Sequence, residues 1–290
     1  MTLPTGLDYT PPIGDLPASR ASWALEADRA AVLVHDLQRY FARPYVEGSV
    51  ALGGALASTA RILAAARGAG VPVFYTAQRG DQDQPARGLQ RDLWGPGMRA
   101  TPEHTDILEA VAPADGDTVL VKHRYSAFAR SDFAERLSAA GRDQLVITGV
   151  YAHIGITATA LEAFQREVEP FVVADAVADF SAEAHLRALE QIASCSGVVT
   201  VTEAVVSTFS PPSEWDSRFR AALVGVVPED VVELLFADPD TDWFAQGLDS
   251  LRAFEFLDRL VDDGLDFDFG DFTRTPTLNW LREQARTHGR

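Results

Sequence analysis

The sequence predicts a three-layer α/β/α domain built on a six-stranded parallel sheet, followed by a small all-α domain of four helices. From about residue 29 to residue 206, short apolar runs alternate with segments of helical periodicity. Strands that are apolar along their whole length and separated by helices are typical of a parallel sheet covered on both faces. After residue 217 only helical periodicity remains, and about 75 residues of short helices are typical of a small bundle.

The alternating part contains six expected strands and four expected helices. The strands are expected at residues 29–37, 71–78, 117–125, 143–151, 170–177 and 197–206. The helices are expected at residues 49–70, 131–140, 154–168 and 181–193. The helices have apolar residues at helical spacing, and the first of them ends at a glycine, as helices commonly do. The connection at residues 79–116 is long, includes ARGLQRDLWGPGM (86–98), and is expected to be an irregular loop that covers a substrate.

The segment STFSPPSEWD, residues 207–216, replaces β-branched runs by Ser, Thr and Pro and is expected to be a linker. It separates a first domain, residues 1–206, from a second domain, residues 217–290. Within the second domain, helices are expected at residues 217–227, 229–237, 250–263 and 276–287, with a short piece at 268–273.

The composition is that of a globular protein with an excess of acidic groups. The 290 residues carry a formal net charge of −17, which argues against sequence-independent nucleic-acid binding because that needs a basic surface. The excess is densest in residues 210–290, which hold 17 Asp and Glu against 8 Arg. No apolar run reaches the roughly 18–20 residues of a membrane span, and the first residues lack the features of a signal peptide.

Cysteine and lysine each occur once. Because Cys195 is the only cysteine, no disulfide can form within the chain, and a reducing cytoplasm is the expected location. Cys195 itself is expected to be a buried or half-buried structural residue. Lys122 is the only lysine among 25 Lys and Arg residues. It is expected to stand where a compact ammonium group is needed and a guanidinium would not fit.

Polar side chains follow four of the expected strands at their carboxyl ends. Strand by strand, they are His35 and Asp36; Gln78; Lys122, Arg124 and Tyr125; and Tyr151, His153 and Gly155. Each of them alone is compatible with an ordinary surface residue. In an open parallel sheet, however, ligands bind beyond the carboxyl ends of the strands, so together these residues indicate a pocket.

Three of these strand ends lie in longer motifs: VHDLQRYF (34–41), VKHRYSAF (121–128) and GVYAHIGITATALEAF (149–164). Together with YTAQ, LWGPG and VADAVADFS, they resemble the isochorismatase branch of the cysteine-hydrolase superfamily over essentially residues 1–206. In the hydrolases of that superfamily, the catalytic cysteine stands at the position of Gly155. Isochorismatases are similar to this chain in lacking it. The resemblance therefore implies a reaction that needs no thiolate.

Isochorismate carries its pyruvate as an enol ether, which is hydrolysed by protonation of the terminal methylene carbon. The resemblance implies Asp36 as the general acid, with Lys122 either holding a substrate carboxylate or steering the proton. Gly155 is the third catalytic position and is expected to leave open the space of the missing thiol. The N–H groups of residues 155–156 are expected to hold the enolpyruvyl carboxylate. The substrate-binding residues that the resemblance implies are Gln78, Arg87, Trp94, Tyr125 and Tyr151.

The residue types leave the protonation state of Asp36 open. Burial would raise its pKa, and the neighbouring Lys122 would lower it. The histidines are dispersed along the chain and show no metal-ligand spacing, so no catalytic metal is expected.

A second motif, DWFAQGLDSLRAFEFLDRL (242–260), opens a helix in the acidic region. Taken alone, Asp249 or Ser250 is compatible with a simple helix cap. With its Trp-Phe pair and the later TPTLNWL, the region resembles acyl or aryl carrier proteins, in which this serine receives 4′-phosphopantetheine. The resemblance implies Ser250 as the attachment site. The acidity of the region suits recognition by basic patches on partner enzymes.

The two resemblances together imply a bifunctional protein of siderophore or nonribosomal peptide biosynthesis. It would hydrolyse isochorismate to 2,3-dihydro-2,3-dihydroxybenzoate and pyruvate, and carry an aryl group on its second domain. The implied partners are a phosphopantetheinyl transferase, an aryl-AMP ligase, a condensation domain of a nonribosomal peptide synthetase and a second copy of the chain in a homodimer, with no nucleic acid and no membrane. Two alternatives stay open: hydrolysis of 2-amino-2-desoxyisochorismate, as in phenazine-type pathways, and a non-catalytic carrier or docking protein. Amide hydrolysis, as in nicotinamidases, is disfavoured because the thiol is missing.

Overall fold

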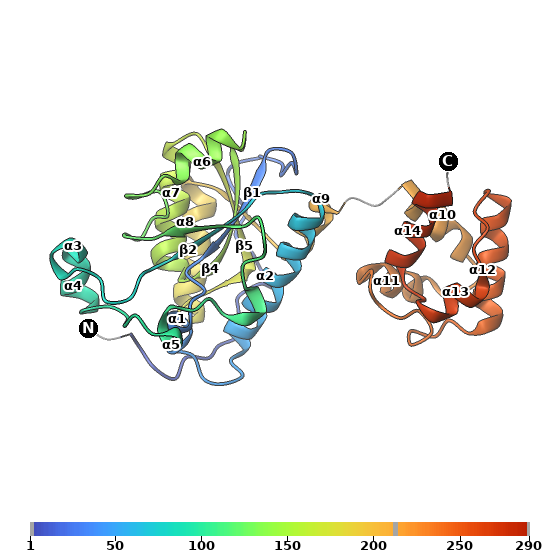
Figure 1. The fold of residues 1–290 in the computed structure, drawn as a ribbon, viewed down its shortest axis with the longest axis horizontal. Coiled ribbons are helices and arrows are strands. Elements are labelled where there is room, and N and C mark those ends of the chain that lie inside the picture. The colour runs from blue at the N-terminus through green and yellow to red at the C-terminus, as the bar shows by residue number, and fades with distance from the viewer. Residues whose placement is uncertain (1–2, 211–213, 289–290) are drawn as a thin grey trace. The chain divides into compact units, whose positions relative to one another are not determined.

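The computed structural model describes residues 3–210 and 214–288, and the chain divides into two compact units, Met1–Ser210 and Pro211–Arg290. The first unit contains a six-stranded sheet in which all paired strands are parallel, in the order β3-β2-β1-β4-β5-β6 (Figure 1). This arrangement confirms the predicted fold class. The strands are β1 (Ala30–His35), β2 (Val73–Ala77), β3 (Thr118–Val121), β4 (Gln144–Val150), β5 (Glu169–Ala178) and β6 (Val198–Thr200).

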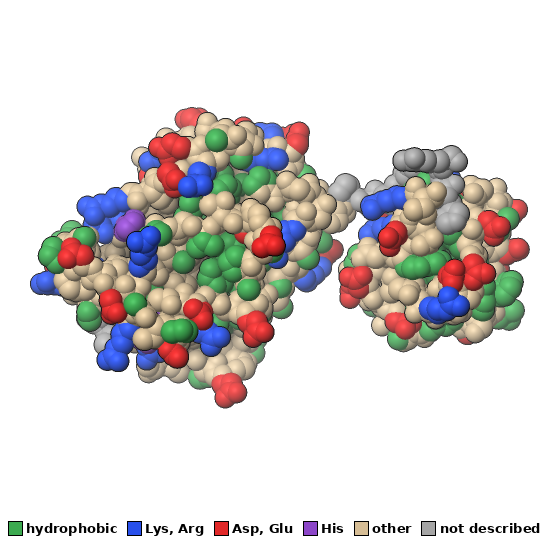
Figure 2. Space-filling view, in the orientation of Figure 1, with side chains coloured by type: hydrophobic (Ala, Val, Ile, Leu, Met, Phe, Trp, Pro, Cys, Tyr) green, Lys and Arg blue, Asp and Glu red, His purple; other side chains and the backbone are tan. Residues whose placement is uncertain are grey.

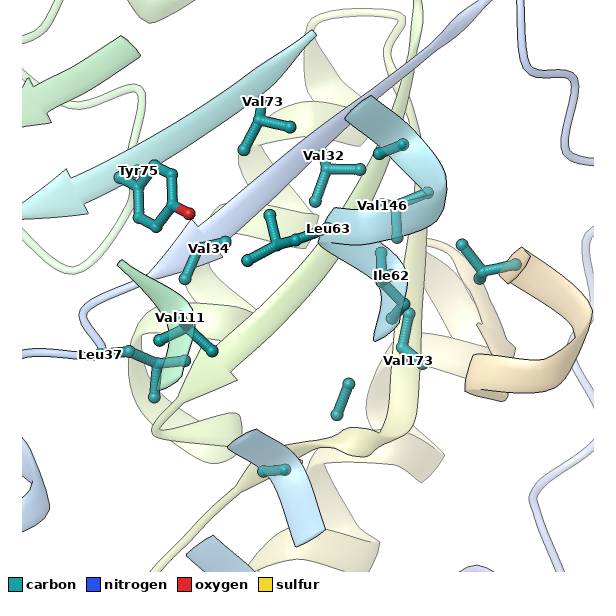
Figure 3. Close-up of a cluster of buried hydrophobic side chains, with 14 of the residues drawn as sticks. Val32, Val34, Leu37, Ile62, Leu63, Val73, Tyr75, Val111, Val146 and Val173 are labelled. Atoms are coloured by element: carbon teal, nitrogen blue, oxygen red, sulfur yellow. The ribbon is translucent and has the colours of Figure 1, made fainter. Parts of the chain in front are cut away.

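Helices cover both faces of the sheet because the central strands are apolar along their whole length. All six residues of β1 are buried, and alternate residues belong to two different cores. Val32 and Val34 share one core with α2 (Val50–Gly68) and α9 (Thr202–Phe209). Figure 3 shows Ile62 and Leu63 of α2 among the valines of this core. The other core contains residues of α6 (Phe133–Ala139), α7 (Thr157–Gln165) and α8 (Ala182–Cys195).

The connection between β2 and β3 is a series of short helices, so the expectation of one irregular loop is wrong. Asp83 begins the first of them, because its carboxylate accepts a hydrogen bond from the Ala86 N–H at 2.9 Å. Gly88 and Gly95 both have positive φ and separate the helical turns. Pieces this short cannot show helical periodicity in the sequence. They are α3 (Gln84–Arg87), α4 (Leu89–Trp94), α5 (Pro102–Thr105) and the 3-10 turn η1 (Glu109–Val111); a similar piece, α1 (Arg39–Ala42), follows β1.

The sixth strand is shorter than the expected strand at 197–206, because α9 begins at Thr202. The first N–H group of this helix, that of Thr202, donates to the carboxylate of Asp175 at 2.8 Å. Val205 and Phe209 of the same helix are buried in the core that contains α2. Capping and burial together therefore override the strand propensity of the β-branched residues.

The expected linker at residues 207–216 is in part helical. Its first residues belong to α9, which ends at Phe209, and its last residues belong to α10, which begins at Glu214. Residues 211–213 lie outside the described part of the chain.

Over residues 214–288, the second unit is a bundle of four longer helices and one short helix, as the sequence predicts. Its core is aromatic, with Trp243, Phe219, Phe256 and Phe272 fully buried. Acidic side chains are spread over the face of this unit that Figure 2 shows. Within residues 3–210 and 214–288, no helix is long and apolar enough to cross a membrane. The helices are α10 (Glu214–Leu223), α11 (Glu229–Ala237), α12 (Ser250–Asp262), α13 (Phe269–Arg274) and α14 (Leu278–His288).

Candidate active site

A cavity lies at the carboxyl ends of β1 to β4, where open parallel sheets bind their ligands. All eight residues that the sequence assigns to catalysis or substrate binding line it: Asp36, Gln78, Arg87, Trp94, Lys122, Tyr125, Tyr151 and Gly155. Arg124 and His153 do not line it. The guanidinium of Arg124 donates to the Ala86 carbonyl, and the His153 ring contacts Asp179. The strands thus bring together residues that are up to 119 positions apart in the chain, Asp36 and Gly155.

Asp36 lies directly after β1, where the chain leaves the sheet with a φ of 53°. Its carboxylate is buried and accepts two short hydrogen bonds, from Thr76 Oγ1 to Oδ1 at 2.6 Å and from Lys122 Nζ to Oδ2 at 2.7 Å. Thr76 is beside it because β1 and β2 pair in parallel with His35 opposite Thr76. Lys122 directly follows the next strand, β3, and is 4% exposed. The only lysine therefore forms a buried ion pair with Asp36.

The pKa of Asp36 results from opposing effects. Burial alone would raise it, but the charge of Lys122 and the hydrogen bonds from Lys122 and Thr76 outweigh this and hold the pKa below its usual value. The sequence leaves open whether the pKa of Asp36 is raised or lowered, and the structure shows that it is lowered. At neutral pH Asp36 is a carboxylate and Lys122 is its counter-ion.

A turn of π-helix, η2 (Ala152–Ile156), follows β4 and forms the next wall of the cavity. The buried carboxylate of Asp179, after β5, holds this turn by accepting the His153 N–H at 2.7 Å. The Val150–Tyr151 peptide is cis, and the Tyr151 hydroxyl donates to the Phe41 carbonyl at 2.7 Å. The Ile156 N–H donates to the Tyr151 carbonyl at 3.3 Å. The expectation that the N–H of residue 156 holds a carboxylate is therefore wrong, because the π-helical turn already uses it.

The short helices after β2 contribute the remaining wall. Arg87 is nearly buried, and its Nε and Nη1 donate to the Gly95 carbonyl at 2.7 Å and to Gln82 Oε1 at 3.2 Å. Among the described residues no carboxylate forms an ion pair with Arg87, although its side chain lines the cavity. The Trp94 Nε1–H donates to the Tyr125 hydroxyl at 2.6 Å and so joins this wall to the segment that follows β3. A guanidinium held in this way suits a carboxylate of a ligand.

The segment that contains most of the site residues matches a known protein family. Residues 30–204, more than half of the chain, match the family model of the isochorismatase domain. The chain belongs to the isochorismatase family. It is similar to the phenazine biosynthesis protein PhzD of Pseudomonas fluorescens, with 46% identity over 206 residues that cover 70% of this chain and 99% of the relative.

Two other isochorismatase relatives are similar over both units. Enterobactin synthase component B of Escherichia coli (strain K12) is 39% identical over 273 residues, 94% of each chain. The isochorismatase of Bacillus subtilis (strain 168) is 34% identical over 291 residues, 96% of this chain and 93% of the relative. Among solved structures, a cysteine hydrolase from Pseudomonas syringae pv. phaseolicola 1448A superimposes with a TM-score of 0.60 at 28% identity, covering 67% of this chain and 97% of that one.

The isochorismatase site has no empty space at Gly155, which corrects an expectation from the sequence. An alanine Cβ at this position would overlap Cε1 of His35 and lie 2.9 Å from its Nε2. The buried His35 ring stands there because its Nδ1 is 2.9 Å from the Val150 carbonyl and its Nε2 is 3.3 Å from the Tyr125 carbonyl. Burial, and after it the charge of Lys122, lowers the pKa of His35 to about 4. The imidazole is therefore neutral at physiological pH.

Several lining residues are missed by reasoning from the sequence. Thr76 is the most consequential, because it fixes one oxygen of Asp36. It could have been found from the sequence, since it lies on the expected second strand two positions before Gln78, where a parallel register places it beside the end of the first strand. The others include Leu3, Tyr40, Phe41, Gln90, Met98 and Ile154, none of which directly follows an expected strand.

Cys195 takes no part in the site. It is exposed at the end of α8, where its Sγ donates to the Gln191 carbonyl at 3.2 Å, so the expectation of a buried or half-buried residue is wrong. The buried positions of α8 are occupied by other residues, such as Leu189 and Ile192, whereas Cys195 is the last residue of the helix. In the part of the chain that the structure describes, no three His, Cys, Asp or Glu residues are grouped so as to hold a metal ion.

The second unit matches a family model as well. Residues 217–282 match the phosphopantetheine attachment site, which confirms a carrier region with a covalent phosphopantetheine cofactor. Ser250 is the first residue of α12 and is exposed. Asp249 caps this helix, since its carboxylate accepts the Arg252 N–H at 2.9 Å. The cap is therefore the aspartate, and the Ser250 hydroxyl has no hydrogen-bond partner among the described residues, so it fits a covalent attachment point.

Proposed function

We propose that residues 1–206 hydrolyse the enol ether of isochorismate to 2,3-dihydro-2,3-dihydroxybenzoate and pyruvate, and that residues 217–290 carry an aryl group on phosphopantetheine attached to Ser250. The observation that carries the first part is the buried Asp36–Lys122 ion pair in a cavity whose helical turn offers no nucleophilic side chain. The family of residues 30–204 and the two-unit relatives support the same reaction and the same combination with a carrier.

The chemistry requires a proton at the methylene carbon of the enol ether. Since Asp36 is ionised in the free site, the proton has to come through it from a neighbour, and Lys122 Nζ is 2.7 Å from its Oδ2. We infer that Asp36 first takes this proton from the Lys122 ammonium and then delivers the same proton to the methylene carbon. The C=C π bond breaks, and the positive charge is shared by the ether carbon and oxygen.

The same pair suits the second half of the reaction. Once Lys122 is neutral and Asp36 is again a carboxylate, the negative charge stabilises the oxocarbenium ion. Water adds to the cationic carbon and returns one proton to the pair. The resulting hemiketal passes its hydroxyl proton to the ether oxygen attached to the ring. The bond between this oxygen and the hemiketal carbon breaks, which releases pyruvate and the ring alcohol. Arg87 binds a carboxylate of the substrate, while Gln78, Trp94, Tyr125 and Tyr151 orient the enol ether against Asp36.

The carrier function depends on Ser250. A phosphopantetheine on its hydroxyl supplies a long arm whose thiol forms a thioester with the aryl acid. The chain's own contribution is an exposed hydroxyl at the start of α12, with the Asp249 cap keeping this turn in place. The exposed Leu251 and Phe254 of the same helix offer partner enzymes an apolar contact beside the attachment point.

We further propose the partner enzymes, the cellular location and the oligomeric state of the chain. The partners are a phosphopantetheinyl transferase, an aryl-AMP ligase and a condensation domain of a nonribosomal peptide synthetase. The exposed free thiol of Cys195 fits a reducing cytoplasm. A homodimer is expected, and sedimentation equilibrium of the full chain tests it.

The alternative substrate is 2-amino-2-desoxyisochorismate, which presents the same enol ether to Asp36. The similarity to PhzD favours this substrate for residues 30–204, but that similarity covers 70% of the chain, whereas the enterobactin synthase component covers 94%. Steady-state kcat/KM for the two substrates separates the two functions.

The test of the hydrolase is Asp36→Asn, an isosteric change that keeps the acceptor for Thr76 but cannot relay a proton. We expect kcat for pyruvate release to fall by about 10²–10⁴-fold, with isochorismate binding by calorimetry retained. Asp92→Asn makes the same change at an exposed position and is the control. If Asp36→Asn keeps most of the wild-type kcat, Asp36 is not the acid.

The test of the carrier is mass spectrometry after incubation with a phosphopantetheinyl transferase and coenzyme A. The full chain is expected to gain one phosphopantetheine, located by peptide mapping on Ser250, and Ser250→Ala is expected to gain none. A wild-type chain that gains no mass contradicts the carrier function.

A further inference from the structure

Gly155 lies in the turn η2, and the reason for its lack of a side chain lies at the end of β1. Its backbone does not have the positive φ that favours glycine, so an alanine is conformationally allowed there. The three atoms nearest to a Cβ at this position are all ring atoms of His35: the Cβ would overlap Cε1 and lie 2.9 Å from Nε2 and 3.1 Å from Nδ1. Any side chain at residue 155, a cysteine included, would therefore meet this imidazole first.

The His35 ring has no free path away from that place. It is fully buried, and both ring nitrogens face backbone carbonyls, Val150 at 2.9 Å and Tyr125 at 3.3 Å. Its backbone is held as well, because β1 and β4 approach so closely that a Cβ at Gly149 would overlap the His35 carbonyl. Since the neutral imidazole carries one N–H, it donates to only one of these carbonyls and packs against the other, and a fully buried ring enclosed in this way transmits a push instead of absorbing it.

The ring also adjoins the reacting group. His35 Nδ1 lies 3.9 Å from Oδ2 of Asp36, the oxygen that accepts the hydrogen bond from Lys122. A displacement of the ring away from residue 155 therefore disturbs the Asp36–Lys122 pair. Because catalysis depends on reacting atoms being placed within about 1 Å, such a shift is costly for kcat.

We propose that His35 is a positioning residue of this site. Its imidazole occupies the space that a side chain at residue 155 would need and lies beside the Asp36 carboxylate. Glycine is therefore required at residue 155. In this view the residue at position 35 decides whether the site can hold a nucleophile at position 155. Gly155 is then required by His35 and not by the substrate. The inference deepens the proposed enol ether hydrolysis and rests on it for the kinetic arm of the test.

The experiment compares four full-length chains: wild type, Gly155→Ala, His35→Asn and the double variant. Asparagine places an amide N–H near the position of the imidazole Nδ1–H, so it keeps a donor toward Val150 while it removes the ring atoms that a Cβ would meet. Gly53→Ala is the matched control, since Gly53 lies in α2 with nothing within 4 Å of a Cβ. The readouts are the thermal midpoint of the first unit, and kcat and KM for pyruvate release from isochorismate.

We expect Gly155→Ala to lower the midpoint by about 3–10 °C, as overpacking does, while Gly53→Ala leaves it unchanged or slightly raised. The kcat of Gly155→Ala is expected to fall about hundredfold, with a smaller change in KM. In the double variant the midpoint is expected to return to that of His35→Asn, and kcat to exceed that of Gly155→Ala by about tenfold or more. This rescue is the signature of the proposed pair.

Two results would overturn the inference. One is a Gly155→Ala chain as stable and active as Gly53→Ala. The other is a double variant no more stable than Gly155→Ala, which means that the ring is not the obstacle. If Gly155→Ala does not fold at all, a folded double variant supports the inference, and an unfolded one beside a folded His35→Asn contradicts it. The thermal midpoints are measured without substrate. If isochorismate is not the substrate, the kinetic measurements show no turnover, but the comparison of the midpoints still tests the inference.

Discussion

A fall in pH from 8 to 5 should destabilise the first unit through His35. Burial and the charge of Lys122 lower the pKa of this imidazole to about 4, whereas a histidine in the unfolded chain titrates near 6.5. Between these two values the unfolded chain binds a proton that the folded chain does not, so stability is lost as the pH falls. The slope is about 1.4 kcal/mol per pH unit, and the loss between pH 8 and pH 5 is about 2 kcal/mol.

The assay is hydrogen exchange of the full chain, read at peptides from β1 and β4. These strands report the free energy of opening of the first unit separately from the second. His35→Asn is the control, since the asparagine side chain does not titrate in this range. His185 is also buried and its pKa is also lowered, but it is present in both chains, so the difference between their pH dependences isolates His35.

The outcome depends on the difference in slope and not on the absolute stability of the variant. We expect the wild type to lose about 2 kcal/mol more than His35→Asn between pH 8 and pH 5. Equal losses in the two chains would refute the reasoning, because they would mean that the folded site accommodates a charged imidazole.

Other contacts lead to further measurable effects. Lys122→Met leaves the buried Asp36 without a counter-charge. The first unit should therefore lose about 3–5 kcal/mol of its free energy of unfolding in the same exchange assay, and kcat should fall at least about hundredfold. An unchanged kcat would show that Lys122 supplies no proton. Arg87→Lys keeps the charge but loses the planar fork, so in steady-state assays KM should rise about tenfold while kcat stays within about threefold; the reverse split would contradict a binding role. Asp249→Ala removes the cap of α12, so the second unit should lose about 1 kcal/mol in urea unfolding followed by tryptophan fluorescence, while Ser250 is still modified; unchanged stability would contradict the capping role.

The parallel sheet and the helical second unit follow from local patterns in the sequence. Apolar runs that are buried on both faces, as in β1, and amphipathic segments such as α12 show their periodicity within ten to twenty residues. The same patterns place Asp36, Gln78 and Lys122 at strand ends, and the parallel arrangement then brings them to one edge. Local patterns fail where tertiary contacts prevail, as in α9, whose β-branched residues fold as a helix because Val205 and Phe209 fill the core beside α2.

By itself, the sequence determined the architecture, the pairing of a hydrolase with a carrier, and the identity of the residues around one pocket. These properties depend on periodicity and on motifs, which are local. Only the tertiary structure decided that Asp36 is ionised, because its pKa results from the balance between burial and the 2.7 Å contact with Lys122. Only the structure revealed that the His35 imidazole fills the space beside Gly155. His35 and Gly155 are 120 positions apart. A single sequence gives no sign that two such distant residues pack together, since their contact exists only in the folded chain.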